Sequence, residues 1–524
     1  MLLVLAAAVF ALQQAHEHQA PPASSALVEV AKRAPLVRAG IGEAHDTIGT
    51  TSKEAQAQYD RGLAYLHSYW WLEAARCFNQ ALRLDPRLAI AHAQLSLAYT
   101  ELNASAASSE SLAQAQARAM ASSVSDHDRR HVDLRAAQAA AEAAGAWNAG
   151  AQSAFRAALD EAIVKYPGDE EFLLLRGLAE SPDPAERGQG SVAASVPYFQ
   201  KAAARAPAHF AAHHYLTHAY ENTGRIQEAL AEGATYAKMA ANVPHARHMH
   251  GHNLRRVGRI DDAIAEFLAA DTLESSYFAG ERIPAEYDWH YQHNIDLLAT
   301  SYQYIGQMKK AEALFKRSFA IPSSLAVQEY NKREWPVFLL ARGRASEAFD
   351  AAAVMASHRS PIVSAAGHVM IGHAKLALGD FKAAADEANI ALRLMRATPL
   401  GAGIVANALQ QLQGEFLLRT GQREKAQPML KELVKKVRAA PGPDAWSQAL
   451  FTLESIARAA RDTGDWELAA WTANEMMDHD PNYAGSQYAL ALAAEHQGDR
   501  AKAAAAMALA KQYWKNADPD VALK

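Results

Sequence analysis

The hydrophobic positions of this chain are spaced as on helices, and small and aromatic residues recur among them at fixed distances. One set lies at relative positions 0, 3, 12, 16, 19 and 24: Gly62, Tyr65, Ala74, Phe78, Ala81 and Pro86. Small residues at such intervals let two antiparallel helices approach closely, and the aromatic side chains fill the space between them. Asp85-Pro86 then ends the second helix, because proline cannot continue it. The set predicts one pair of packed helices.

Turn glycines extend this pattern along the chain. Gly224 and Gly258 are 34 residues apart, as are Gly464 and Gly498. Further glycines of this kind, each followed five residues later by alanine, are Gly306, Gly343, Gly379 and Gly421. A fixed period of this length is typical of a repeat array in which each helix pair packs against its neighbours. We expect about twelve helix pairs over roughly residues 55–517.

The 34-residue pattern resembles the tetratricopeptide repeat. The resemblance covers nearly the whole chain and implies an all-α, right-handed solenoid. It also implies a concave groove that accepts a protein or peptide partner.

The repeats fall into three groups: N-terminal units at 51–209, histidine-rich units at 210–325, and C-terminal units at 326–524. Gly258 and Gly306 are 48 residues apart, which indicates a 14-residue insertion within residues 274–291. The inserted segment is rich in aromatic residues. Insertions in repeat arrays emerge on one face, often the binding face.

The N-terminus resembles an export signal. Residues 1–15 are interpreted as a signal peptide, with cleavage near Ala11, because a short apolar run is followed by small and polar residues. We expect an extended Ala/Pro-rich segment at 16–50 and a periplasmic or extracellular location. Cleavage after Ala15 would instead expose His16-Glu17-His18 as a copper-binding tripeptide. Cys77 is the single cysteine, so no disulfide forms within one chain, and we expect it to be buried in a helix.

Composition excludes some classes of function. Alanine is abundant, whereas glycine (28) and proline (20) are sparse, which favours helix. The 52 basic and 57 acidic residues give a net charge of −5 without charged blocks. Because a nucleic-acid-binding surface needs a basic stripe, we expect no nucleic-acid partner. Beyond the N-terminal run, the sequence predicts no transmembrane helix.

Histidines are concentrated in one region. Ten of the 22 lie within residues 209–293, where an even spread would place about 3.6 (22 × 85/524). We number each repeat so that its turn glycine, such as Gly224 or Gly258, is position 15. His214 and His218 then occupy positions 5 and 9 of one repeat, and His248 and His252 occupy the same positions of the next. Residues four apart share a helix face. In tetratricopeptide arrays, which this repeat resembles, the face at positions 5 and 9 lines the concave groove, so the resemblance implies that both pairs face it.

Four imidazoles on adjacent helices predict a site for one transition metal ion, such as zinc, copper or iron. Glu221 and His293 are the expected auxiliary ligands or orienting groups. The expected outer partners are Asn294, Asp296 and Tyr220. We interpret His213, His245 and His250 as structural or surface residues. The remaining pair, His127 and His131, stands beside two arginines and is interpreted as a solvated face.

A narrower resemblance concerns the same region. Residues 213–225, 248–259 and 291–295 are similar to segments of exported bacterial tetratricopeptide proteins, which share an H-x3-H-x2-E helix, an H-M-x2-H helix and a following H-N. The resemblance carries over to His214, His218, Glu221, His248, Met249, His252, His293 and Asn294. His250 stands where such proteins commonly have proline. The resemblance implies a site but no particular reaction.

Three functions remain open. The first is an exported scaffold whose groove holds a metal ion and a partner or substrate. The second is a metal-free scaffold that binds a protein or peptide. The third is a metal-dependent enzyme, hydrolytic or oxidative, that uses the same cluster. The sequence contains no HExxH, GxSxG, phosphate-binding loop or dinucleotide fingerprint that would indicate a particular enzyme.

Overall fold

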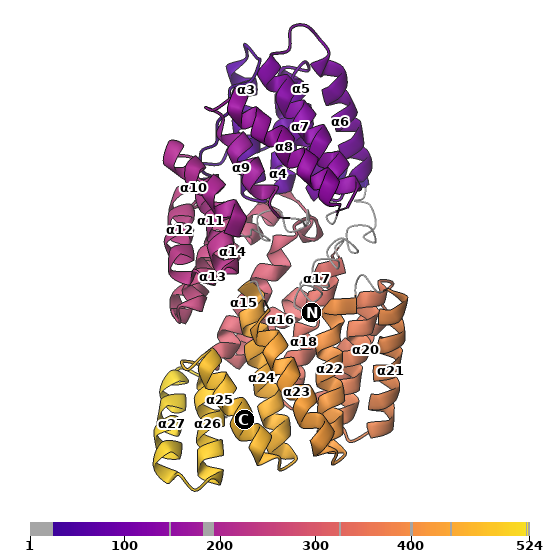
Figure 1. Cartoon of the computed structure of the whole chain (residues 1–524), viewed down its shortest axis with the longest axis vertical. Coiled ribbons are helices and arrows are strands. Elements are labelled where there is room, and N and C mark those ends of the chain that lie inside the picture. Colours follow the sequence, from indigo (N-terminus) through magenta and orange to yellow (C-terminus); the bar gives the residue numbers. More distant parts are fainter. Residues whose placement is uncertain are drawn as a thin grey trace. The chain divides into compact units, whose positions relative to one another are not determined.

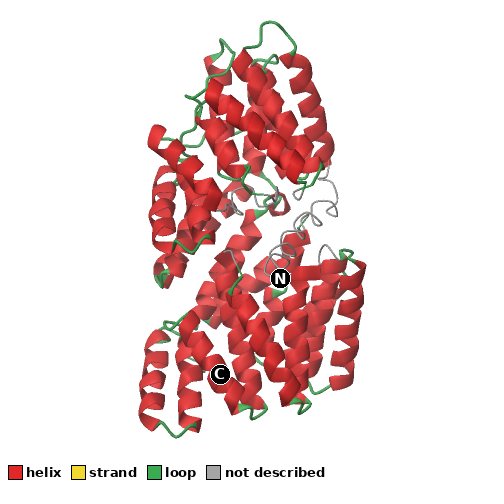
Figure 2. Cartoon of the chain, in the orientation of Figure 1, coloured by secondary structure: helices red, strands yellow, loops and turns green. Residues whose placement is uncertain are grey.

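The computed structural model describes residues 25–145, 148–181, 193–323, 326–398, 402–440, 443–519 and 521. Within these residues the regular structure is helical, apart from one isolated β-bridge between Glu43 and His209 (Figure 2). The predicted all-α fold is therefore confirmed. The proposed signal peptide, residues 1–15, lies outside the described residues.

The chain divides into two compact units, Ala20–Tyr291 and Gln292–Lys524 (Figure 1). The first unit contains α2 (Ser25–Ala31), α3 (Lys53–His67), α4 (Trp71–Leu84), α5 (Ala89–Glu101), α6 (Ser105–Ala119), α7 (Asp126–Ala143), α8 (Ala149–Lys165), α9 (Glu170–Leu178), α10 (Val196–Arg205), α11 (Ala211–Asn222), α12 (Ile226–Met239), α13 (Pro244–Arg256) and α14 (Ile260–Glu281). The sequence-based group 210–325 spans the division between the units.

The second unit follows the same principle. Its helices are α15 (His290–Tyr304, which begins in the first unit), α16 (Met308–Ala320), α17 (Ala326–Asn331), α18 (Glu334–Ala341), α19 (Ala345–Ala356), α20 (Pro361–Ala377), α21 (Phe381–Ala397), α22 (Ala402–Arg419), α23 (Arg423–Arg438), α24 (Pro443–Asp462), α25 (Trp466–His479), α26 (Ala484–His496) and α27 (Arg500–Tyr513). No helix among the described residues of the chain is long and apolar enough to cross a membrane.

Successive helices pack as pairs in both units, as in α3 with α4, α13 with α14 and α26 with α27. The predicted turn glycines adopt left-handed backbone conformations, with φ of 77° at Gly224 and 79° at Gly258. The small residue of the pattern is needed where the helices touch, since a Cβ at Gly62 would lie 2.4 Å from the Phe78 ring. These features confirm the tetratricopeptide-type register.

A non-helical segment precedes the first repeat helix. Residues 32–52, here called the N-terminal strap, follow α2 and bury Ile41 and Ile48 in the core of the first unit. Gln56 of α3 fixes the strap, because its Nε2 donates to the Asp46 backbone oxygen at 2.8 Å and its Oε1 accepts from the Ile48 nitrogen at 3.1 Å. The strap thus has a defined path against the repeats.

The aromatic insertion returns to the first repeat. It lengthens α14 to Glu281 and continues through a short 3-10 turn, η3 (Ala285–Tyr287). Tyr277 is buried, and its hydroxyl donates to Glu73 Oε1 at 2.8 Å. The Trp289 ring stacks on Trp71 with centroids 5.3 Å apart. The insertion therefore closes over the turn between α3 and α4.

Candidate metal centre

Three buried imidazoles meet between two neighbouring repeats. His214 and His218 lie one turn apart on α11, and His245 follows the proline that begins α13. Their Nε2 atoms are separated by 3.0 Å (214 to 218), 3.3 Å (218 to 245) and 3.0 Å (245 to 214). We call these residues the histidine triad. A four-coordinate ion bound to imidazole nitrogens at 2.0–2.1 Å holds its donors about 3.3 Å apart, so the triad has the size that one ion requires.

The protonation of the triad suits metal binding. His214 Nδ1 donates to the His67 backbone oxygen at 2.6 Å, which leaves the lone pair on Nε2. Burial lowers the pKa of His218 to about 3. Burial, reinforced by repulsion between the rings, also lowers the pKa of His214 and His245. All three rings are therefore neutral at pH 7, the form that ligates a metal.

Tyr69 encloses the triad. Its ring centroid lies 4.6 Å from that of His214, 5.1 Å from His245 and 6.0 Å from His218. Its backbone is left-handed, with φ of 57°. The inserted Trp289 contacts both the Tyr69 and His245 rings, and its Nε1 donates to the Tyr69 backbone oxygen at 3.1 Å. The first repeat and the insertion together form an aromatic cover, so the expected open groove is closed at this point.

The two histidine pairs chosen from the sequence lie in different groups. His248 and His252 approach each other, with Nε2 atoms 2.9 Å apart, and the His248 ring lies 4.3 Å from that of His290. No group among the described residues brings all four predicted imidazoles within 4.8 Å of one another. His245 connects the pairs, with its ring 5.9 Å from that of His248.

Glu221 and His293 were the predicted auxiliary ligands or orienting groups. Glu221 is buried on α11, and its Oε1 lies 3.9 Å from Arg256 Nη1. His293 lies on the part of α15 that belongs to the second unit. His213 and His250 were interpreted as structural or surface residues, and both pair with carboxylates. His213 Nδ1 lies 2.6 Å from Glu232, and His250 Nδ1 lies 3.2 Å from Glu266.

The sequence interpretation did not include His245 among the candidate ligands, whereas the structure places it beside His214 and His218. It stands three residues before His248, at position 2 of its repeat. His293 holds position 2 of the following repeat and was predicted to be an auxiliary ligand. The shared position in the repeat could therefore have identified His245 as a candidate ligand too.

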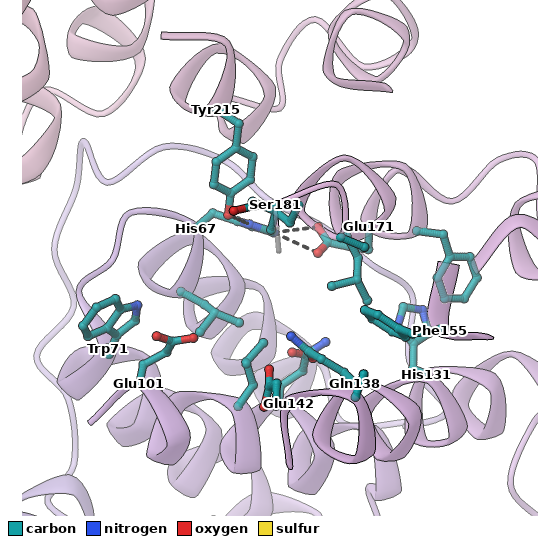
Figure 3. Close-up of a pocket in the computed structure, with 18 of the residues that line it drawn as sticks. His67, Trp71, Glu101, His131, Gln138, Glu142, Phe155, Glu171, Ser181 and Tyr215 are labelled. Atoms are coloured by element: carbon teal, nitrogen blue, oxygen red, sulfur yellow. Dashed lines mark hydrogen bonds and ion pairs between the residues drawn. The ribbon is translucent and has the colours of Figure 1, made fainter. Parts of the chain in front are cut away.

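A cavity of about 110 Å³ adjoins His67, whose backbone oxygen accepts from His214 Nδ1. His67 lies in its wall, with Nδ1 2.9 Å from the Tyr215 hydroxyl and Nε2 2.8 Å from Glu171 (Figure 3). His209 also contacts Glu171, at 3.0 Å. Burial alone would raise the pKa of Glu171, but the charges and hydrogen bonds of the two histidines lower it. The Glu171 carboxylate is thus held ionised beside the cavity.

The remaining HxxxH pair is not the solvated face that the sequence suggested. His131 is buried, and His127 is partly buried. Both Nε2 atoms point to Asp169 Oδ2, at distances of 2.9 Å and 3.0 Å. Hydrogen bonds to Asp128 and Asp169 raise the pKa of His127 to about 10. The interpretation was wrong because the carboxylates come from distant segments that the local sequence does not reveal.

Comparisons with known proteins give only distant structural likenesses. A scan against protein-family models and a search of curated proteins give no match. The human IFIT1 dimer with PPP-AAAA is 12% identical over 87% of this chain and 89% of that chain, with a TM-score of 0.36. The APC/C hetero-tetramer Cut9–Hcn1 is 12% identical over 88% of both chains (TM-score 0.33). The P58(IPK) TPR domain is 12% identical over 85% and 98% (TM-score 0.22).

Likenesses at this identity and with TM-scores below 0.5 say nothing about what this chain binds. The tetratricopeptide-type fold rests on its own repeats and helix pairs.

Proposed function

We propose that this protein is an exported helical-repeat scaffold that holds one transition metal ion on His214, His218 and His245. The observation that carries the proposal is the triangle of buried Nε2 atoms, 3.0–3.3 Å on each side. One cation at its centre would use three lone pairs that otherwise face one another. Three imidazoles suit zinc, copper or iron.

The surroundings of the triad favour a structural ion. Such an ion would join α11 to α13. The backbone oxygen of His67, at the end of α3, accepts from His214 Nδ1 and so orients this ligand. Tyr69 and Trp289 pack over these rings, which favours a closed site over the accessible coordination position that a catalytic metal requires. The concave surface of a repeat array is the natural place for a protein or peptide partner.

Metal analysis of protein purified without an affinity tag tests the proposal. His218→Ala/His245→Ala, which removes one ligand from each helix, should carry one ion fewer per chain than wild type. His213→Ala is the matched control, because it alters the same helix but a ring that pairs with Glu232. The control should keep the wild-type metal content.

Helicity measured by circular dichroism must accompany the metal count. A double variant that stays helical and retains the full wild-type metal content would refute the triad as the site. If the double variant unfolds, the single variant His218→Gln replaces it, with the same expected loss of one ion.

A further inference from the structure

The pair on α7 belongs to a second constellation of metal-binding side chains. His127 and His131 lie one helical turn apart, and their Nε2 atoms meet carboxylates from two other segments. One is Asp169, at the start of α9, and the other is Asp46, in the N-terminal strap. We propose that these four residues, the Asp46 group, form a second metal site that takes a divalent transition ion.

The distances support donors arranged around one centre. Asp169 Oδ2 lies 2.9 Å from His127 Nε2 and 3.0 Å from His131 Nε2. Asp46 lies farther away, with Oδ1 3.6 Å from His127 Nε2 and Oδ2 3.5 Å from His131 Nε2. The latter two distances are long for hydrogen bonds. They are close to the roughly 3.3 Å that separates donors sharing one four-coordinate ion.

Each ligand is held from outside the group. Asp169 uses its other oxygen, Oδ1, to accept from the Glu171 backbone nitrogen at 2.8 Å, which leaves Oδ2 to face the imidazoles. The Phe172 ring stacks on His131 with centroids 4.3 Å apart. Asp128, which contacts His127, is itself fixed by the Gly49 backbone nitrogen at 3.0 Å. Such outer contacts orient the ligands of metal sites.

Asp46 supplies an independent observation. Its side chain is only 8% exposed, and its Oδ2 has no hydrogen-bond partner among the described residues. A buried carboxylate oxygen without a donor is costly. The strap nevertheless places it there, and Gln56 holds the Asp46 backbone in position. A bound cation would satisfy this oxygen, whereas an ion-pair network confined to Asp169 and the two histidines leaves it without a hydrogen-bond donor.

The donor set indicates the class of ion. Two imidazoles and two carboxylates form a harder ligand set than three imidazoles, and they suit Zn²⁺ and also Mn²⁺. His131 also lines the cavity beside Glu171 (Figure 3). The Asp46 group shares no residue with the triad, so either site can exist without the other.

Titration of Zn²⁺ into the full, chelator-treated chain, measured by calorimetry, tests this site. Asp46→Asn keeps the shape of the side chain while removing its charge, and we expect it to bind one Zn²⁺ fewer than wild type, or to bind that ion at least tenfold more weakly. His127→Asn/His131→Asn should lose the same ion. The matched control is His45→Asn, which breaks an exposed contact with Asp60 and should leave binding unchanged.

The triad variant separates the two sites. His218→Ala/His245→Ala should keep the Zn²⁺ that Asp46→Asn loses, and it should bind Mn²⁺ as wild type does when followed by electron paramagnetic resonance. If folded Asp46→Asn and His127→Asn/His131→Asn both bind Zn²⁺ as wild type does, the Asp46 group is an ion-pair network and the proposal is wrong. A triad variant with unchanged metal content would overturn the triad alone.

Discussion

Tyr69 lies in the turn between the two helices of its repeat, where other repeats have residues that tolerate a left-handed backbone. The equivalent position in the next repeat, 34 residues later, is Asn103, with φ of 56°, and Gly224 and Gly258 stand at later turns. Asparagine and glycine tolerate this conformation, whereas a bulky residue pays roughly 1–2 kcal/mol for it. The Tyr69 ring packs on all three triad imidazoles. Its contacts with the site explain why this conformation is retained.

Replacing Tyr69 by glycine should reveal this balance. The change relieves about 1 kcal/mol of backbone strain but removes a buried aromatic ring, which costs about 3 kcal/mol or more. We expect Tyr69→Gly to lower the free energy of unfolding by about 2 kcal/mol in urea denaturation. Asn103→Gly, at the equivalent turn, should change it by less than about 1 kcal/mol. A Tyr69→Gly protein as stable as wild type would show that the ring contributes no more than the roughly 1 kcal/mol of backbone strain that the change relieves.

The buried imidazoles also predict a response to acid. In chelator-treated protein, His218 keeps its neutral form down to its lowered pKa of about 3, whereas in the unfolded chain it takes up a proton near pH 6.5. The unfolded state then binds more protons, so stability falls as the pH drops from about 6.5 towards 3. His218→Asn lacks this titration, and its urea midpoint should decline less between pH 7 and pH 4. Parallel declines would contradict the prediction.

At the scale of the helix, the sequence predicted the features that residues within one repeat determine. Helix pairs followed from turn glycines and from close contacts such as Gly62 against Phe78, because both are set by residues within one repeat. The sequence predicted an insertion, but the contact of this segment with Trp71 could not be predicted, because the contact joins segments about 220 residues apart.

The candidate sites show the same limit. His214 and His218 were found because one helix face displays both of them. The Asp46 group was missed, because its donors lie on the strap, α7 and α9, and only the assembled unit brings them together. Helical spacing thus identifies pairs of ligands, whereas the third and fourth ligands depend on tertiary packing.

At the scale of the whole chain, the export proposal predicts a shorter mature protein. The apolar run at Leu2–Leu12 should be removed near Ala11. Intact-mass spectrometry of protein from the periplasm or medium should therefore show a chain that begins shortly after that residue. A full-length chain confined to the cytoplasm would refute export. An N-terminus at His16 would support the copper-binding tripeptide instead.

The path of the N-terminal strap has a consequence for any shortened form of this protein. A fragment that starts at Lys53, where the first repeat helix begins, would keep every repeat of the first unit. It would lose Asp46 and also Gly49, whose backbone nitrogen fixes Asp128. Such a fragment could pass every test of helical structure and still lack a ligand. The limits of the repeats are therefore not the limits of the part of the chain that must be kept for binding studies.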